Sequence, residues 1–304
     1  MNDYDRYLGS VGHDTLKDIW DRNEAPISAV PTHLPTWNSM CRDEGGAIGL
    51  AHGWHVIVAG KTGSGKSLFG LNMAVRAMRK KHKVGFVSLE MSHRQLITRA
   101  LSIYTKTPVG DLEPGHYYDS NQFERASQQW VDEAEHLLYV NRAPINSLAE
   151  ISDAITKAYE TEGVRFFITD YLQLAWVSNA ESIHTQITEV SHTIRGLAQK
   201  LGIVSVGLSQ YNRETSKSHD RPEVTGLMGG SSLENDADQV ILLDHTTYKT
   251  QSSLEATQEV LLAKNRHGSA GRIAVQWDYK TLTVSELTTN EPTVDRGDAW
   301  EAPF

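Results

Sequence analysis

The chain has 304 residues, enough for one large α/β domain with arms or for two modest domains. Its formal net charge is −9 at pH 7, so no overall basic field attracts nucleic acid or anionic membranes; such contacts must be local or built by oligomerisation. The single cysteine, Cys41, excludes an intrachain disulfide framework, and no apolar run is long enough to span a membrane, so we expect a soluble cytoplasmic protein.

Residues 1–28 form a polar, acidic N-terminal arm. Within it, Leu16, Ile19 and Trp20 share one face of a short helix by their i, i+3, i+4 spacing. One apolar turn is not stable alone. We therefore expect this helix to dock, either on its own domain or on a neighbouring subunit.

The next element is an apolar run at 54–59, followed by a glycine-rich turn that fits G-x-x-x-x-G-K-[ST]. Glycines allow successive backbone N–H groups to point at phosphate oxygens, assisted by the positive end of the helix that follows. The lysine of this motif is expected to contact the β- and γ-phosphates, and its serine hydroxyl to bind Mg²⁺. The predicted ATP-binding loop consists of Gly60, Lys61, Thr62, Gly63, Ser64, Gly65, Lys66 and Ser67.

Strands and helices alternate after this loop, which predicts an α/β fold with a mostly parallel sheet. Strands are expected near 84–89, 138–140, 164–169, 203–208 and 239–243, and helices near 66–80, 92–106, 122–136, 147–160 and 185–201, two of them with serine caps. Residues 257–287 read as three strands joined by tight turns, an antiparallel C-terminal extension. We assign 29–285 to the ATPase domain and 286–304 to an acidic, disordered tail.

Three polar residues that end predicted strands are candidates for chemistry at the phosphates. Asp170 ends the apolar run VRFFITD and is expected to hold Mg²⁺ directly or through water. Glu90 ends the strand after the P-loop helix, where a carboxylate can orient the attacking water; the alternative is a solvated helix cap. Gln210 ends a later strand and is a candidate γ-phosphate sensor, with plain surface polarity as the alternative.

Six motifs in order resemble one known family. SLEM, DYLQL, the helix ITEVSHTIRGLAQKLGI, LSQYNR, LENDAD and LLAKNRHGSAG are similar to the motifs of the RecA-like motor domain of DnaB-type replicative hexameric helicases and their phage relatives. The resemblance covers roughly residues 30–285 and fits a phage-like form without the N-terminal domain. It implies a RecA-like P-loop NTPase core with helices on both faces of its sheet, ATP and Mg²⁺ as cofactors, and ATP-driven 5′ to 3′ translocation on single-stranded DNA during replication.

The resemblance also implies residue roles and an assembly. Glu90 becomes the catalytic carboxylate, Asp170 the metal-linked acid and Gln210 the γ-phosphate sensor. Lys264 and Arg266 correspond to a pair that reaches the neighbouring subunit's ATP site, where the arginine stabilises the transition state. The implied active form is a ring, six subunits being the usual number and seven remaining open; without the family, the pair reads as a solvated hairpin.

The DNA-facing loop departs from the family pattern. Relatives carry an arginine and an acid where this sequence has Met228 and Gly229. Backbone N–H groups and hydroxyls can still contact phosphates without reading sequence, and the alternative is an ordinary polar loop. The candidate DNA-binding residues are Lys217, Arg221, Gly229, Gly230, Ser231 and Ser232.

The acidic tail suggests a partner-binding role. Trp300 and Phe304 are candidate anchors for a polymerase, primase or loader, and the alternative is a merely solubilising tail. Two other functions remain open for the whole chain: a RecA-like recombinase or mediator that forms filaments, and a non-DNA assembly or signalling ATPase. The implied setting is the cytoplasm of a bacterial or phage-infected cell.

Overall fold

The computed structural model describes residues 29–41, 48–112, 121–139, 147–178, 180–211, 222–227, 230–252 and 254–287. The predicted arm (1–28) and nearly all of the predicted tail lie outside the described residues, so the docking helix and the aromatic anchors stay predictions.

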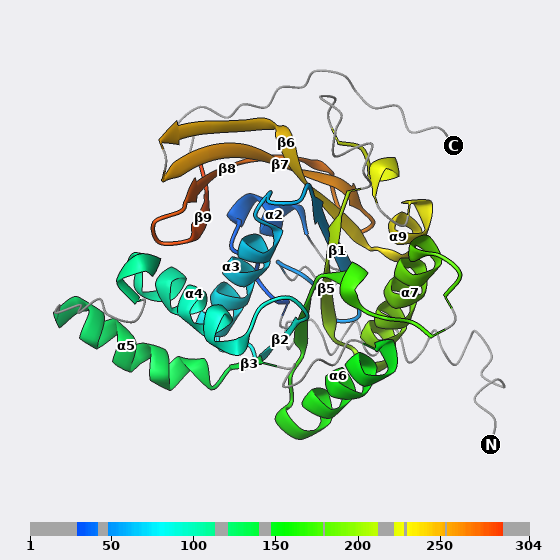
Figure 1. Cartoon of the computed structure of the whole chain (residues 1–304), viewed down its shortest axis with the longest axis horizontal. Coiled ribbons are helices and arrows are strands. Elements are labelled where there is room, and N and C mark those ends of the chain that lie inside the picture. The colour runs from blue at the N-terminus through cyan, green and yellow to red at the C-terminus, as the bar shows by residue number, and fades with distance from the viewer. Residues whose placement is uncertain are drawn as a thin grey trace, which may run out of the picture.

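One nine-stranded sheet forms the centre of the described structure, in the order β3-β2-β4-β5-β1-β6-β7-β8-β9 (Figure 1). The strands from β3 to β6 in this order are parallel, and β7, β8 and β9 continue the sheet antiparallel. The predicted fold class and antiparallel extension are therefore confirmed. The strands are β1 (His55–Gly60), β2 (Val84–Ser88), β3 (Leu137–Tyr139), β4 (Phe166–Asp170), β5 (Val204–Gln210), β6 (Gln239–Ser252), β7 (Glu255–Asn265), β8 (Gly271–Asp278) and β9 (Thr283–Glu286).

Helices cover both faces of the sheet, because parallel strands need crossover connections (Figure 1). The helices are α2 (Pro35–Met40), α3 (Lys66–Arg79), α4 (His93–Thr105), α5 (Asn121–Ala134), α6 (Leu148–Glu162), α7 (Ile183–Leu201) and α9 (Gly230–Asp236), with short 3₁₀ turns at Val109–Leu112, Leu172–Leu174 and Val224–Gly226. Ser92 and Ser147 cap α4 and α6 in full capping boxes, as the sequence predicts. No described helix has the length and apolarity that a membrane crossing needs.

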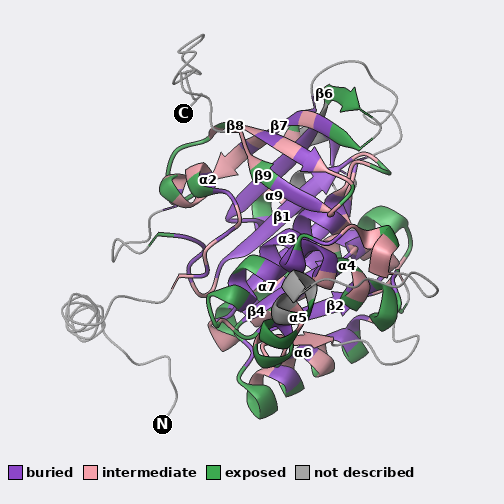
Figure 2. Cartoon of the chain, turned by 90° about the vertical axis from the view of Figure 1, so that its left-hand side faces the viewer, coloured by how far each residue is buried: buried purple, intermediate pink, exposed green. Residues whose placement is uncertain are grey.

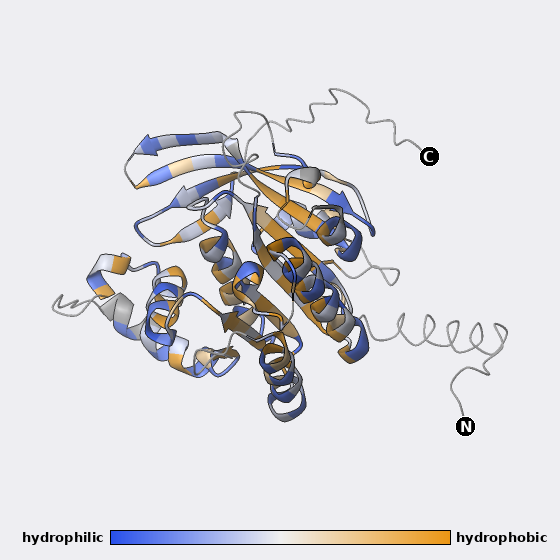
Figure 3. Ribbon diagram, turned by 45° about the vertical axis from the view of Figure 1, so that its right-hand side comes forward, coloured by the Kyte–Doolittle hydropathy of each residue, from blue (hydrophilic) through white to orange (hydrophobic). Residues whose placement is uncertain are grey.

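Two apolar cores lie on opposite faces of the sheet. Along β1, Val56 and Val58 pack into the core shared with α3 and α4, whereas Ile57 and Ala59 pack into the core shared with α6 and α7. The central strands are therefore buried on both faces, as Figure 2 shows by burial and Figure 3 by hydropathy. This double burial holds the carboxyl ends of β1, β2, β4 and β5 in fixed register.

Three elements differ from the sequence prediction. β6 has 14 residues instead of the expected five, because beyond Leu243 it continues as a polar, partly exposed strand paired with β7. The segment that begins at Gly230 was expected as a loop and forms the short helix α9 instead. α2 was not predicted; it buries Trp37, whose indole N–H donates to Gln239 Oε1 at 2.9 Å.

Candidate functional site

The glycine-rich loop joins β1 to α3. Gly63 and Gly65 have φ angles of +78° and +85°, a region that favours glycine. A Cβ on Gly65 would lie 2.6 Å from a ring carbon of Trp277, and one on Gly60 would lie 2.4 Å from the Ser64 hydroxyl oxygen. The motif's glycines are therefore required by backbone conformation and by packing together.

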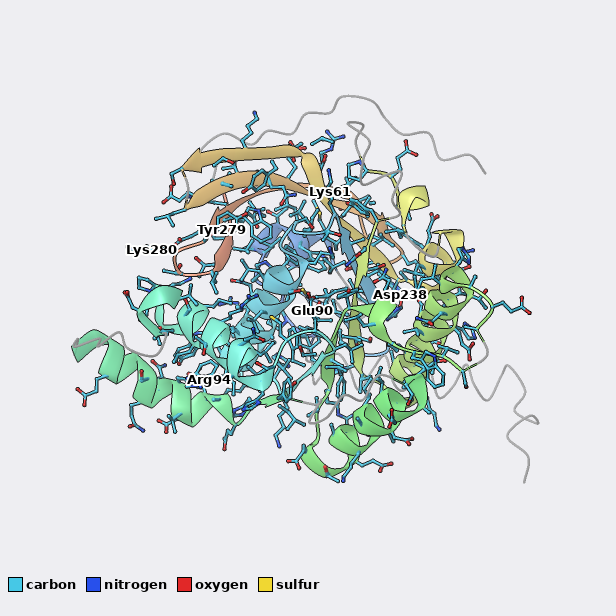
Figure 4. The ribbon with its side chains drawn as sticks, viewed as in Figure 1. Lys61, Glu90, Arg94, Asp238, Tyr279 and Lys280 are labelled. Atoms are coloured by element: carbon cyan, nitrogen blue, oxygen red, sulfur yellow. The ribbon has the colours of Figure 1, made fainter. Side chains whose placement is uncertain are left out.

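A cavity of about 320 Å³ opens above this loop. It lies at the edge where parallel strands present their carboxyl ends, because Gly60 pairs with Gln210 and Ser88 pairs with Asp170. Glu90, in the turn after β2, is labelled in Figure 4. The lining residues are Thr62, Gly63, Gly65, Lys66, Ser67, Leu68, Glu90, Arg99, Asp170, Tyr171 and Gln210.

Lys66 is held inside the loop. Its ammonium donates hydrogen bonds to the carbonyl oxygens of Gly60 at 3.0 Å and Lys61 at 2.9 Å. Burial lowers the pKa of Lys66 to about 8, and the nearby carboxylates of Asp170 and Glu90 oppose that shift. The positive charge is thus already positioned at the cavity that the motif predicts for phosphates.

Asp170 presents a buried carboxylate to the same cavity. The side chain is 1% exposed, and neither carboxylate oxygen has a hydrogen-bond partner among the residues that the structure describes. Burial raises the pKa of Asp170 to about 6; the neighbouring Ser67 hydroxyl lowers it and the Glu90 carboxylate raises it further. Two unpaired carboxylate oxygens beside a serine hydroxyl are a donor set that suits a hard divalent cation.

Three cavity residues were not predicted as site residues from the sequence. They are Leu68, which follows the P-loop serine, Arg99 of α4, and Tyr171, which directly follows Asp170. Tyr171 was detectable by its position next to the strand-ending acid. Arg99 was not detectable from the sequence, because α4 also contains Arg94, which does not line the cavity (labelled in Figure 4).

Lys264 and Arg266 lie near the beginning of β1, at the other end of this strand from the P-loop. The Arg266 amide donates to the Asp238 carbonyl at 2.9 Å, and Asp238 accepts a hydrogen bond from the His55 amide at 2.8 Å, at the first residue of β1. The Arg266 guanidinium donates to the Asn235 carbonyl, and the Lys264 ammonium donates to the Glu234 carbonyl, both near the end of α9. The pair therefore caps the negative end of a helix, with Lys264 half-buried and Arg266 exposed.

The candidate DNA-binding residues are only partly described. Lys217, Arg221 and Gly229 lie outside the described residues, as does Met228. Gly230, Ser231 and Ser232 are the first three residues of α9, which packs against α7. The predicted contacts of these residues with DNA stay predictions.

Residues 43–286 match the family model of the DnaB-like helicase C terminal domain, which is most of the chain. The chain belongs to this family. The resemblance inferred from six motifs is therefore confirmed, and membership implies that the cavity above the P-loop binds a nucleotide.

Individual relatives agree with this family. The chain is 31% identical over 239 residues to the probable plasmid replicative DNA helicase of Chlamydia psittaci, a match that covers 78% of this chain and 52% of the relative. The chain thus spans about half the length of that curated relative. Among solved structures, the ATPase domain of a phage helicase superposes with a TM-score of 0.78 at 23% identity over 92% of this chain and all of that domain. A second solved structure is of a DnaB-like replicative helicase and concerns its interactions with primase. It superposes with a TM-score of 0.74 at 22% identity, over 94% of this chain and 68% of the helicase chain.

Proposed function

We propose that this chain is an ATP-driven replicative DNA helicase motor that translocates on single-stranded DNA. The observation that carries the proposal is the cavity in which Lys66, Asp170 and Glu90 meet, in a chain of the DnaB-like helicase family. Family membership supplies the link to DNA replication, and the cavity supplies the hydrolytic site.

The residues fit Mg²⁺ as the metal of this site. Ser67 and Asp170 would hold it, since the Asp170 oxygens are buried and unpaired among the described residues. The described residues contain no group of three His, Cys, Asp or Glu side chains that could hold a metal ion. An Mg²⁺ ion bound to Ser67 and Asp170 would therefore take its remaining ligands from phosphates and water. When bound, Mg²⁺ neutralises charge on the β- and γ-phosphates.

The protein groups then have distinct roles. The P-loop N–H groups and the Lys66 ammonium bind and orient the phosphates. Glu90 lies exposed at the cavity wall, where its carboxylate can accept a proton from the attacking water. Gln210 lines the cavity at the end of β5 and can contact the γ-phosphate, so that its position reports hydrolysis to the adjoining segment of the chain.

The placement of Arg266 supports hydrolysis across subunits. It lies beside the first residue of β1, whereas the P-loop follows the last, and a six-residue strand separates those ends by roughly 17–20 Å. An arginine side chain cannot cover that distance. A role for Lys264 and Arg266 in ATP hydrolysis therefore requires a neighbouring copy, and a closed ring, six subunits by family analogy, provides one at every site.

Unwinding of a forked DNA substrate tests this function. The chain with ATP and Mg²⁺ should separate the fork when a 5′ single-stranded tail is present, and Lys66→Ala should abolish both ATP binding and unwinding. ATP hydrolysis without unwinding and without salt-sensitive binding of single-stranded DNA would contradict the helicase assignment. The same proposal includes a cytoplasmic location. It also includes binding of a polymerase, primase or loader through the C-terminal residues that end at Phe304.

A further inference from the structure

The turn between β7 and β8 carries Arg266, and hydrogen bonds fasten the start of this turn to the sheet. The Arg266 amide donates to the Asp238 carbonyl at 2.9 Å. The side chain of the preceding residue, Asn265, accepts from the Gln239 side chain at 3.0 Å and donates to the Met40 carbonyl at 2.9 Å. The backbone on the amino-terminal side of Arg266 is therefore fixed.

The residue after the arginine, His267, is fixed by its ring. The imidazole stacks on the indole of Trp54, with the ring centroids 4.2 Å apart and the planes inclined by 10°. Trp54 is only 7% exposed and directly precedes β1, and its carbonyl accepts from the Ser205 amide at 2.9 Å. A buried indole that is anchored to the sheet in this way is a rigid support for a second ring.

Asp238, labelled in Figure 4, contacts the edge of the same imidazole. Its Oδ1 lies 3.7 Å from Nε2 of His267, and its Oδ2 accepts from the His55 amide at 2.8 Å. Only 34% of the His267 side chain is exposed, although Arg266 beside it is exposed. The indole and the carboxylate together restrict the imidazole, and through it the backbone on the carboxyl-terminal side of Arg266.

Arg266 must exchange one partner for another if it acts on the nucleotide of a neighbouring subunit. In the single chain its guanidinium donates to the Asn235 carbonyl, at the end of α9. An arginine loses much rotamer freedom when it binds a phosphate, so any freedom of the backbone beneath it would add to that loss. Because the residues on both sides of Arg266 are held, only its side chain has to move.

We propose that His267, stacked on Trp54, is a positioning residue that holds Arg266 in the orientation needed at the neighbouring subunit's nucleotide. In this role the imidazole does not touch the nucleotide and acts only through the backbone that it shares with Arg266. A loosened turn would present the guanidinium in many orientations, few of which stabilise the transition state. This inference rests on the proposed hydrolysis across subunits and adds the residue that orients the arginine.

Two substitutions separate the stacked ring from the imidazole chemistry. His267→Ala removes the stack and should lower kcat about threefold to tenfold, the size of one aromatic pair. The KM for ATP should stay the same, because the P-loop of the neighbouring subunit binds the nucleotide. His267→Phe keeps a flat ring on Trp54 and loses the contact with Asp238, so its kcat should stay within about twofold of the unaltered value. A phenylalanine variant as slow as the alanine variant would overturn the stacking role.

Mixed assemblies test whether His267 acts through the arginine of its own chain. A Lys66→Ala chain supplies Arg266 to the intact P-loop of an Arg266→Ala chain, and steady-state ATP hydrolysis of the mixture is measured. Placed in the Lys66→Ala chain, His267→Ala should lower the recovered rate about threefold to tenfold. The matched control places the same substitution in the Arg266→Ala chain. It should leave the recovered rate unchanged, because that chain has no guanidinium to position.

Failure of this inference is distinguishable from failure of the proposed function. An equal loss of rate from His267→Ala in either chain would show a general structural defect and would overturn the positioning role. No loss in either chain would overturn it as well. No recovery in the mixture without any His267 substitution would instead overturn hydrolysis across subunits, on which the inference rests.

Discussion

Gly65 shows how one residue couples the nucleotide loop to the antiparallel strands. A Cβ at this position would lie 2.6 Å from a ring carbon of Trp277. The backbone φ of Gly65 is +85°, which raises the conformational energy of a residue with a side chain by about 1–2 kcal/mol. We expect Gly65→Ala to lower the free energy of unfolding and to weaken ATP binding at least about tenfold, since the loop must move off Trp277. Urea unfolding and nucleotide titration measure the two effects.

The matched control is Gly196→Ala in α7. An added Cβ there meets nothing within 4 Å, and Gly196 has no positive φ. This change should stabilise the chain by about 0.5–1 kcal/mol, because alanine favours helix over glycine. Equal effects of the two substitutions would show that the contact with Trp277 is unimportant.

Burial of His55 at the start of β1 predicts that the free energy of unfolding falls in acid. His55 is fully buried between Ser191 and Ser205, and burial lowers its pKa from 6.5 to about 4, with Asp238 and Asp236 opposing that shift. The folded state then binds a proton less readily than the unfolded state. Its contribution to stability is complete above pH 6.5 and is lost as the pH falls through about 4, by up to about 3 kcal/mol.

Unfolding free energies measured from pH 7 to pH 4 check this expectation. The unaltered chain should lose stability across that interval, and His55→Gln, which stays neutral, should lose less. Parallel pH profiles for the two proteins would contradict the assignment of the slope to His55.

Helix caps can be compared at the scale of elements. Ser147 and Ser92 have the same capping box, at α6 on one face of the sheet and α4 on the other. Alanine at either position should cost about 1 kcal/mol of stability. Only Ser92→Ala should also slow ATP hydrolysis, because Glu90 precedes that cap by two residues and Arg99 lies on the same helix. Equal hydrolysis rates for the two variants would place Glu90 outside the chemistry.

Elements with a local signal were predictable from the sequence, and elements fixed by distant contacts were not. Apolar runs and serine caps located β2, β4, α4 and α6 to within about two residues, because the signal lies inside each segment. The outer half of β6 has a polar sequence and is a strand only through its pairing with β7. α2 is held by burial of Trp37 against Gln239, 202 residues away.

The functional site shows the same contrast between residues with a local sequence signal and residues placed by distant contacts. Asp170 and Gln210 end strands and Glu90 lies two residues after one, so their positions after apolar runs predicted that they meet near the P-loop. Arg99 lies inside α4, and its place at the site appears only when the cavity walls are known.

The whole-molecule prediction concerns sites shared between copies of the chain. Lys66 and Arg266 lie at opposite ends of β1, so one chain cannot place both at one nucleotide. Lys66→Ala and Arg266→Ala chains should each hydrolyse ATP poorly alone. In a mixed ring, an Arg266→Ala chain with an intact P-loop can sit beside a Lys66→Ala chain with an intact arginine, which completes a site.

Random mixing in equal amounts completes about a quarter of the subunit interfaces, so the mixture should recover up to about a quarter of the unaltered rate when sites act independently. The control is a mixture of Arg266→Ala with the double variant Lys66→Ala and Arg266→Ala, which has the same chain ratio and no complete interface. Steady-state hydrolysis after subunit exchange measures both mixtures. Recovery in the first and none in the second requires a guanidinium supplied by the neighbour, whereas no recovery in either leaves Lys264 and Arg266 as a cap on α9 alone.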